Sequence, residues 1–244
     1  MVIENVIQVS NLEVKYDKVT ILNNLNLNIK KGEIVGFIGP SGSGKTTLVK
    51  ALIGMKAPSK GDIEVLGEKL PSLEVVAKVG YMAQADALYD DLTGIDNLLF
   101  FGELYNLKGK AAKARAQELL ELVNLEKDGN KAVKNYSGGM KRRLSLAISL
   151  MHSPELLILD EPTVGIDPVL RRSFWNEFRR IKNNGGTIII TTHVMDEAYN
   201  CDRLALIRDG EIIADGSPKE IIKASGTSNI EEAFLYYSDG KREV

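Results

Sequence analysis

The sequence predicts an α/β protein with a mostly parallel core sheet, an antiparallel β subdomain and an inserted α-helical subdomain. Residues 34–38, 156–159 and 187–190 are short apolar runs without alternation, which is typical of parallel strands buried on both faces. Residues 6–29 alternate short apolar runs with polar breaks, which indicates half-buried antiparallel strands. Residues 85–154 contain no buried-strand run and have a helical pattern. These three observations predict the fold class.

The helical segment divides the core in sequence. Residues 1–84 and 155–244 are predicted to form the α/β core with its antiparallel β subdomain, and residues 85–154 the helical subdomain. Thr93-Gly-Ile-Asp96 resembles a capping box at a helix start, and residues 111–123 are rich in strong helix formers. A length of 244 residues fits one domain that carries a large insertion.

A β-hairpin is predicted near the C-terminal end of the chain. The apolar runs 204–208 and 211–214 flank Asp209-Gly210, a dipeptide favoured in two-residue hairpin turns. The two strands are therefore expected to pair antiparallel.

The composition describes a nearly neutral chain. The 31 Lys and Arg and 33 Asp and Glu residues give a formal net charge of −2, which argues against coating of nucleic acid or anionic lipid. The longest uncharged run, between Lys182 and Asp196, is shorter than the roughly 20 apolar residues that cross a bilayer. The N-terminus lacks a signal-peptide pattern, and the single Cys201 permits no internal disulfide. We therefore expect a cytoplasmic protein.

The first motif that carries chemistry follows the predicted strand at 34–38. Gly39–Thr46 matches G-x-x-x-x-G-K-[ST], and a predicted helix follows directly. The glycines allow main-chain N–H groups and the helix start to face a phosphate. Lys45 is expected to reach the β- and γ-phosphates, and Thr46 to bind Mg²⁺ through its hydroxyl. The predicted nucleotide contacts here are Gly39, Pro40, Ser41, Gly42, Ser43, Gly44, Lys45, Thr46 and Thr47.

Two adjacent carboxylates, Asp160 and Glu161, follow the predicted strand at 156–159. Ligands of open α/β sheets gather at the carboxyl ends of strands. Asp160 is therefore expected to hold Mg²⁺, and Glu161 to accept a proton from the attacking water. Solvated carboxylates that open a loop before Pro162 are the alternative. Together with the phosphate loop, the pair predicts a P-loop NTPase with a RecA-like core that binds ATP and Mg²⁺.

A third motif, Tyr136-Ser137-Gly138-Gly139-Met140, opens a predicted helix at 141–150. It resembles the signature motif, usually LSGGQ, of ATP-binding cassette (ABC) ATPases. Other motifs similar to the family's occur in the family's order over nearly the whole chain, namely the phosphate loop, Gln84, Asp160-Glu161, Gly165-Ile-Asp167 and His193. The resemblance is to the nucleotide-binding subunit of an ABC transporter.

This resemblance implies a head-to-tail dimer that clamps each ATP between the phosphate loop of one subunit and the signature motif of the other. Ser137, Gly138 and Gly139 would contact the γ-phosphate bound to the partner. A simple helix cap and turn is the alternative for these three residues. Asp167 would lie at the dimer seam, or else cap the helix that begins near Pro168.

The resemblance assigns three further positions. Gln84 would touch Mg²⁺ or the attacking water and link the core to the helical subdomain. His193 would contact the γ-phosphate, and Tyr16 would stack on adenine. A surface loop residue, a structural histidine and a plain strand-end tyrosine are the respective alternatives. The implied catalytic residues are Lys45, Gln84, Glu161 and His193, and the implied metal ligands are Thr46, Gln84 and Asp160.

Two positions depart from the family's signature motif. Met140 replaces the usual glutamine and offers no amide, and Tyr136 replaces the usual leucine. Neither change touches the Ser-Gly-Gly backbone. Residues 136–144 are similar to a subgroup of bacterial ABC transporters that export drugs, ions or lipid-linked compounds.

The family resemblance also implies partners. These are a second copy or a related ATPase subunit, and a multi-span membrane subunit that would hold the chain at the inner face of the cell membrane. Residues 95–105 carry more large apolar side chains than one helix face can bury, so some are expected to meet that subunit or to pack the small subdomain. They include Leu98, Leu99, Phe100, Phe101 and Leu104.

The predicted function is ATP hydrolysis that drives export through the membrane subunit. The ATPase subunit of an importer is the first alternative, and a cassette that acts on nucleic acid or ribosomes is the second. No nucleic acid is expected, because the basic clusters at 108–115 and 141–143 are interpreted as solvated helix faces without interleaved aromatic residues. A small-molecule P-loop kinase would leave residues 137–139 without a role.

Overall fold

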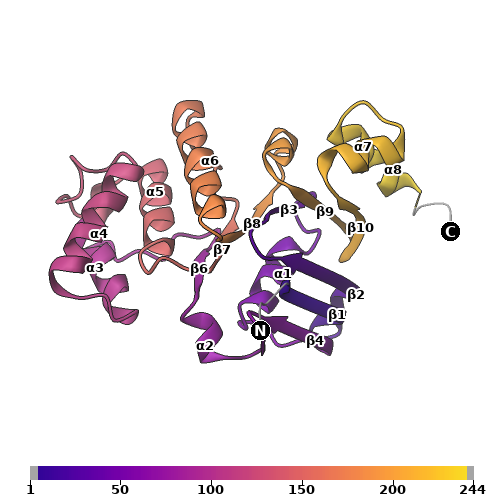
Figure 1. The fold of residues 1–244 in the computed structure, drawn as a ribbon, viewed down its shortest axis with the longest axis horizontal. Coiled ribbons are helices and arrows are strands. Elements are labelled where there is room, and N and C mark those ends of the chain that lie inside the picture. Colours follow the sequence, from indigo (N-terminus) through magenta and orange to yellow (C-terminus); the bar gives the residue numbers. More distant parts are fainter. Residues whose placement is uncertain (1–4, 241–244) are drawn as a thin grey trace.

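The computed structural model describes residues 5–240. Within them, a six-stranded sheet has the order β10-β9-β3-β8-β7-β6, and a four-stranded sheet has the order β2-β1-β4-β5 (Figure 1). The strands are β1 (Asn5–Tyr16), β2 (Val19–Lys30), β3 (Ile34–Ile38), β4 (Lys60–Val65), β5 (Glu68–Lys69), β6 (Val79–Met82), β7 (Leu156–Asp160), β8 (Thr187–Thr192), β9 (Arg203–Arg208) and β10 (Glu211–Gly216).

Helices connect and cover these strands. The α-helices are α1 (Lys45–Leu52), α2 (Leu73–Val76), α3 (Gly94–Leu104), α4 (Gly109–Leu122), α5 (Gly138–Ser149), α6 (Pro168–Asn183), α7 (Pro218–Ser225) and α8 (Ile230–Asp239). Two short 3₁₀ helices are η1 (Val133–Asn135) and η2 (Met195–Asn200). Among residues 5–240, no helix is both long enough and apolar enough to span a bilayer.

The six-stranded sheet is the α/β core that the sequence predicts. Strands β6, β7, β8, β3 and β9 run parallel, and β10 pairs antiparallel with β9. Every residue of β3, β7 and β8 is buried, which explains their unalternated apolar sequences. Because parallel strands end at one edge of a sheet, the loops after β3, β7 and β8 meet there.

The four-stranded sheet is antiparallel, and β1 and β2 bury many of their apolar residues on one side. These buried side chains share a hydrophobic core with α1 and with one face of the six-stranded sheet. The opposite face of that sheet shares a second core with α6 and with α3, α4 and α5, the α-helices of the 94–149 segment. The predicted fold class, with its parallel and antiparallel sheets, is confirmed.

Helices α3, α4 and α5 lie together at one end of the molecule, on the far side of α6 from most of the six-stranded sheet (Figure 1). Helix α3 begins after Thr93, whose hydroxyl accepts a hydrogen bond from the Asp96 N–H at 3.1 Å. Helix α5 begins at Gly138, three residues before the predicted start, because Ser137 Oγ accepts a hydrogen bond from the Met140 N–H at 3.2 Å.

The predicted hairpin forms between β9 and β10 and also supports the phosphate loop. Asp209 and Gly210 have φ values of 50° and 77°, which suit a tight two-residue turn. The Gly210 N–H donates to the Ser43 carbonyl at 3.1 Å. A Cβ atom on Gly210 would lie 2.0 Å from the Ile21 carbonyl oxygen, so a side chain has no room there.

Candidate active site

The phosphate loop joins β3 to α1, and main-chain atoms of β9 pack closely against it. A Cβ atom on Gly39 would lie 2.1 Å from the Ile207 carbonyl oxygen of β9. Gly44 has φ 104°, a conformation that favours glycine, and directly precedes α1. The loop therefore requires glycine at both positions, and the N-terminus of α1 opens into it.

Lys45, the first residue of α1, folds back over the loop. Its Nζ donates to the carbonyls of Gly39 and Pro40 at 2.7 and 2.9 Å. Burial lowers the pKa of Lys45, while the charges of Glu161 and Asp160 act to raise it. The ammonium group is thus held by two neutral carbonyls that an anion in the loop could replace as its partner.

Asp160, the last residue of β7, is 1% exposed and has a partner for each carboxylate oxygen. Thr46 Oγ1 donates to Oδ2 at 3.0 Å, and Thr191 Oγ1 donates to Oδ1. Hydroxyl and carboxylate oxygens are the ligands that Mg²⁺ prefers. The donor set of Thr46 and Asp160 therefore fits a magnesium ion at the phosphate loop.

Glu161 lies next to Asp160 but points to different partners. Its Oε1 lies 3.0 Å from His193 Nδ1, and its Oε2 lies 3.4 Å from Gln84 Nε2. The Glu161 backbone has φ 53°, a left-handed conformation that is strained for a residue with a side chain. The structure thus brings together Gln84, Glu161 and His193, which the sequence places far apart.

One cavity of about 350 Å³ connects the phosphate loop with the predicted adenine contact. Tyr16, Ile21, Gln84 and Glu161 all line it. Tyr16 is 41% exposed, and Lys56 Nζ lies 4.3 Å from the centroid of its ring. The phosphate-loop residues in the cavity wall are Ser41, Gly42, Gly44, Lys45, Thr46 and Thr47.

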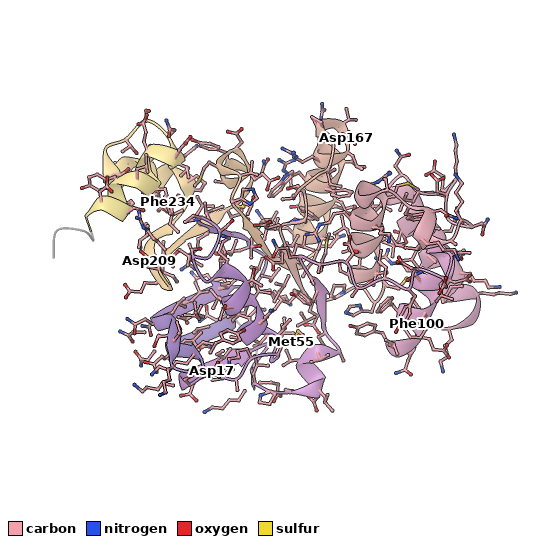
Figure 2. The ribbon with its side chains drawn as sticks, turned by 180° about the vertical axis from the view of Figure 1, so that it is seen from behind. Asp17, Met55, Phe100, Asp167, Asp209 and Phe234 are labelled. Atoms are coloured by element: carbon pink, nitrogen blue, oxygen red, sulfur yellow. The ribbon has the colours of Figure 1, made fainter. Side chains whose placement is uncertain are left out.

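The signature motif lies outside this cavity wall. Ser137 and Gly138 are exposed at the start of α5. A Cβ atom on Gly139 would lie 3.6 Å from the Gly165 carbonyl oxygen, so this motif adjoins the loop that leads to Asp167. Asp167 is exposed at the start of α6 (Figure 2), where its Oδ1 accepts hydrogen bonds from the N–H groups of Val169 and Leu170.

The two departures from the usual signature have different surroundings. Tyr136 is buried, and its hydroxyl donates to the Asp128 carbonyl at 2.8 Å. Met140 is partly buried against the core of the helical segment. Tyr136 thus replaces leucine with a ring that also has a hydrogen-bond partner.

Two residues near the site escaped the sequence analysis. Thr191 holds Asp160, and a threonine at the end of an apolar strand is a weak signal for this role. Arg142 was expected on a solvated helix face, and that interpretation is wrong because Arg142 is 7% exposed and donates to the main-chain carbonyls of Gln84 and Glu161. In the sequence, Arg142 stands between two other basic residues, and nothing in this local pattern indicates that its side chain is buried.

The apolar segment of α3 divides between core and surface. Leu98 is fully buried, whereas Phe100 and Leu104 are exposed. Phe101 lines a second cavity, of about 440 Å³, between the core and the helical segment. Some of the apolar side chains of this helix are therefore exposed, in agreement with the prediction that one helix face cannot bury them all.

The carboxyl ends of the parallel strands thus bring a phosphate loop close to a buried aspartate and the glutamate that follows it. This arrangement defines a P-loop ATPase. The family described as ABC transporter matches residues 22–164, and the chain belongs to this family. It is an ATPase of the ATP-binding cassette type, with a nucleotide-binding domain.

Known relatives and structures agree with this assignment. The chain is 41% identical to the Nod factor export ATP-binding protein I of Burkholderia orbicola over 227 residues, 92% of this chain and 75% of that protein. It is 39% identical to the linearmycin resistance ATP-binding protein LnrL of Bacillus subtilis over 240 residues, 94% of this chain and 77% of that protein.

Solved structures share most of the fold. The ATP-binding subunit of an ABC transporter superposes with a TM-score of 0.89 at 25% identity, covering 96% of this chain and 99% of that one. A dimeric ATP-binding cassette, in a post-hydrolysis state bound to ADP and phosphate, superposes with a TM-score of 0.82 at 26% identity, covering 86% and 98%.

Proposed function

We propose that the chain is the ATP-binding and ATP-hydrolysing subunit of an exporter. The names of its relatives, which refer to Nod factor export and linearmycin resistance, favour export over import. The ATPase subunit of an importer is the alternative. We also propose that residues 1–84 and 155–244, of which 1–4 and 241–244 lie outside the described residues, belong to the α/β core with its antiparallel β subdomain. Residues 85–154 would form the helical subdomain.

The proposed dimer rests on one observation. The N-termini of two helices, each of a kind that can bind an anion, lie in separate places on one chain. Helix α1 begins in the phosphate loop, whereas α5 begins at exposed Ser137 and Gly138. The Gly139 and Gly165 segments adjoin and lead to exposed Asp167. A second copy, or a related ATPase subunit, turned head to tail would place this surface against the ATP in the first cavity.

Hydrolysis follows from the grouping of side chains at the sheet edge. The phosphates would sit in the loop, with adenine on Tyr16, and Lys45 would exchange its two carbonyl partners for phosphate oxygens. Mg²⁺ would neutralise charge on the phosphates, with Thr46, Asp160 and Gln84 as its protein ligands.

The attacking water would lie beside Glu161. Its oxygen forms a bond to the γ-phosphorus, the bond to the ADP oxygen breaks, and Glu161 accepts the proton that the water loses. His193, 3.0 Å from Glu161, is positioned to orient that carboxylate and to reach the γ-phosphate.

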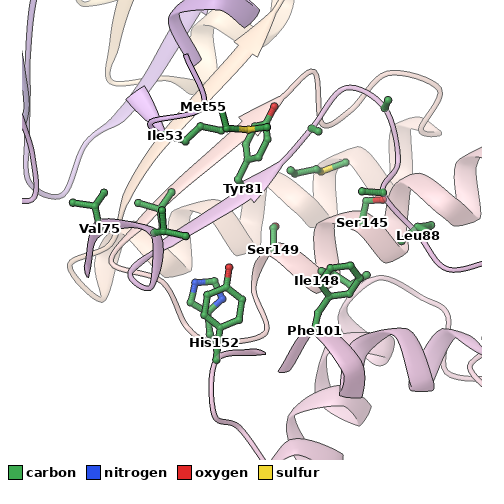
Figure 3. A pocket seen from close by; sticks show the side chains of 17 residues that line it. Ile53, Met55, Val75, Tyr81, Leu88, Phe101, Ser145, Ile148, Ser149 and His152 are labelled. Atoms are coloured by element: carbon green, nitrogen blue, oxygen red, sulfur yellow. The ribbon is translucent and has the colours of Figure 1, made fainter. Parts of the chain in front are cut away.

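The apolar cavity of about 440 Å³ is the proposed docking site of a multi-span membrane subunit (Figure 3). It opens between the core and the helical segment, and Ala83 and Ala85 on either side of Gln84 line it. Docking there would hold the chain at the inner face of the membrane. Larger lining residues include Met55, Val76, Tyr81, Leu88, Phe101 and Ile148.

Mixing two inactive variants tests the composite sites. Lys45→Ala damages the phosphate loop and Ser137→Arg damages the signature, so each homodimer has two damaged sites. The mixed dimer has one site in which both halves are intact. We therefore expect the mixture to hydrolyse ATP faster than either variant alone at the same total concentration. A single variant with wild-type turnover, or a mixture no faster than its parts, would contradict the composite arrangement.

A further inference from the structure

The side chain of Arg142, on α5, joins two segments of the active site. Its Nη1 donates to the carbonyls of Ala83 and Gln84 at 2.7 and 2.9 Å. Its Nη2 donates to the carbonyl of Glu161 at 2.7 Å and also to that of Asp160. One guanidinium group therefore holds the main chain of Gln84 and the main chain of Glu161.

Arg142 is buried and has one carboxylate, that of Asp86, within ion-pair distance. The nearest acidic group is Asp86, whose Oδ1 lies 3.7 Å from Nη1 and also accepts a hydrogen bond from Ser145 Oγ at 2.7 Å. Burial lowers the pKa of Arg142, and the charges of Asp86, Asp160 and Glu161 raise it. A buried charge is costly unless it is fully hydrogen-bonded, so the carbonyls carry much of its stabilisation.

The Glu161 backbone needs such support because its φ of 53° is strained. The Glu161 N–H donates to the Thr191 carbonyl and hydroxyl at 3.1 and 3.0 Å. The Glu161 carbonyl accepts from Arg142. The backbone is thus fixed on both sides of the residue, and this fixes the direction in which its carboxylate leaves the strand.

We propose that Arg142 is a positioning residue for hydrolysis, which locks Gln84 and Glu161 to α5 and to each other. The proposal rests on the proposed function, in which both side chains act on the water or its metal. Arginine suits this role because its planar fork reaches several carbonyls at once, whereas the single ammonium group of lysine cannot span both pairs. Arg142 makes no hydrogen bond to Tyr16 or to the phosphate loop, which are the proposed contacts to ATP.

The next residue supplies a matched control. Arg143 is also on α5 and donates to two carbonyls, those of Val123 and Asn124, at 3.1 and 2.8 Å. These acceptors follow α4, away from Gln84 and Glu161. We therefore compare Arg142→Gln and Arg142→Lys with Arg143→Gln. The comparison distinguishes an effect of the guanidinium group at position 142 from the general effect of losing an arginine on α5.

The experiment measures kcat and KM for ATP, the Kd for ADP, and hydrogen exchange at the amides near 84 and 161. We expect Arg142→Gln to lower kcat on the order of 10²-fold and Arg142→Lys roughly tenfold, because a small displacement of a reacting group is costly. The Kd for ADP should stay at the wild-type value, and exchange near 84 and 161 should accelerate. Arg143→Gln should keep the wild-type kcat and exchange.

A wild-type kcat in Arg142→Gln would overturn the proposal, as would a loss of ADP affinity as large as the loss of kcat. If Arg142→Gln does not fold, a wild-type kcat in Arg142→Lys has the same meaning. An inactive wild-type chain would instead refute the proposed function. Hydrogen exchange would still test the Arg142 clamp in that case, since unchanged exchange in Arg142→Lys would refute it.

Discussion

At the scale of single residues, Asp160 and Glu161 are neighbours with opposite surroundings. Asp160 is buried between Thr46 and Thr191, whereas Glu161 reaches the cavity beside Gln84 and His193. Asp160 ends β7, whereas Glu161 follows the strand with a left-handed backbone, so one position can hold a metal while the next handles a proton. The two carboxylates are therefore not interchangeable.

The role of Glu161 leads to a direct prediction. Glu161→Gln should lower ATP turnover by roughly 10²- to 10⁴-fold, because glutamine cannot accept the proton from water. ATP affinity should be retained, since Lys45 and Thr46 are unchanged, and an ATP-bound dimer should accumulate. Turnover assays with size-exclusion chromatography measure both effects, and exposed Glu126→Gln is the control. Near-normal turnover would exclude Glu161 as the proton acceptor.

His152 gives a prediction for pH. Its ring stacks on Tyr105 with centroids 3.7 Å apart and planes 4° from parallel. Burial lowers the pKa of His152 from 6.5 to about 4, opposed by the Val79 backbone and assisted by Arg115. The folded ring stays neutral while the unfolded ring protonates near 6.5, so its contribution to stability is complete above that pH and declines as pH falls towards 4.

His152→Phe keeps the stacked ring and removes this titration. Between pH 7 and pH 4.5 the free energy of unfolding should fall by about 1–3 kcal/mol more in the wild type than in the variant. Urea unfolding at the two pH values gives the difference, because all other groups are common to both proteins. Equal falls in the two proteins would show that His152 is not held neutral by the fold.

At the scale of elements, caps decide where several helices begin. Asp167 accepts hydrogen bonds from the N–H groups of Val169 and Leu170 at 3.1 and 3.0 Å, and Pro168 occupies the first turn. The alternative that Asp167 caps this helix is thus seen in the structure. Its expected place at the dimer seam stays a prediction, and both roles can coexist in one exposed residue.

Two substitutions separate these roles of Asp167. Asp167→Asn should keep the stability of α6, since asparagine caps as well as aspartate, whereas Asp167→Ala should lower the free energy of unfolding by about 1 kcal/mol. Urea unfolding measures the cap, and the ATPase rate measures the seam. Equal stability of the alanine and asparagine variants would mean that the cap contributes nothing. If Asp167→Asn is as stable as the wild type but hydrolyses ATP more slowly, the negative charge of Asp167 acts at the dimer seam.

Sequence patterns predict some elements of this fold and miss others for physical reasons. The strands β3, β7 and β8 are apparent because burial on both faces leaves an unalternated apolar run in each, at 34–38, 156–159 and 188–190. Strand β6 has four residues, including a glycine and a tyrosine, and so lacks a recognisable run. Its place at the edge of the sheet follows from pairing with β7, a long-range contact that local pattern does not encode.

The candidate site divides in the same way. Gly39–Thr46 is continuous, and its chemistry follows from residue order alone. Gln84 and His193 were found through a family resemblance, since a lone amide and a lone histidine carry little signal. Arg142 was assigned to a solvated face because its neighbours Lys141 and Arg143 are also basic, and its burial depends on carbonyls from other segments.

At the scale of the whole molecule, the apolar cavity beside α3 and β6 is a surface that a partner can cover. Met55 lines it (Figure 3), and this side chain is 69% exposed. Met55→Glu should place a charge against the docked subunit and prevent co-purification with a multi-span membrane protein, while ATPase activity of the isolated chain is retained.

Pull-down from membranes of the source organism measures this effect. Leu235→Glu is the matched control, because Leu235 is also an exposed apolar residue, on α8 at the other end of the molecule. Retention of the membrane protein by Met55→Glu would exclude this cavity as the docking site. Recovery of nucleic acid or ribosomes alone with the wild type would reverse the proposed function.

Helix α5 has a consequence for how two subunits would work together. Exposed Ser137 caps its N-terminus, and Arg142 in its second turn donates to the Glu161 carbonyl, so this helix connects the exposed signature motif to Glu161. In the proposed dimer, ATP on one subunit would thus influence the geometry of the carboxylate in the other. The hydrolysis rate would then rise with ATP concentration more steeply than a hyperbola, a cooperativity produced by one helix without a separate regulatory site.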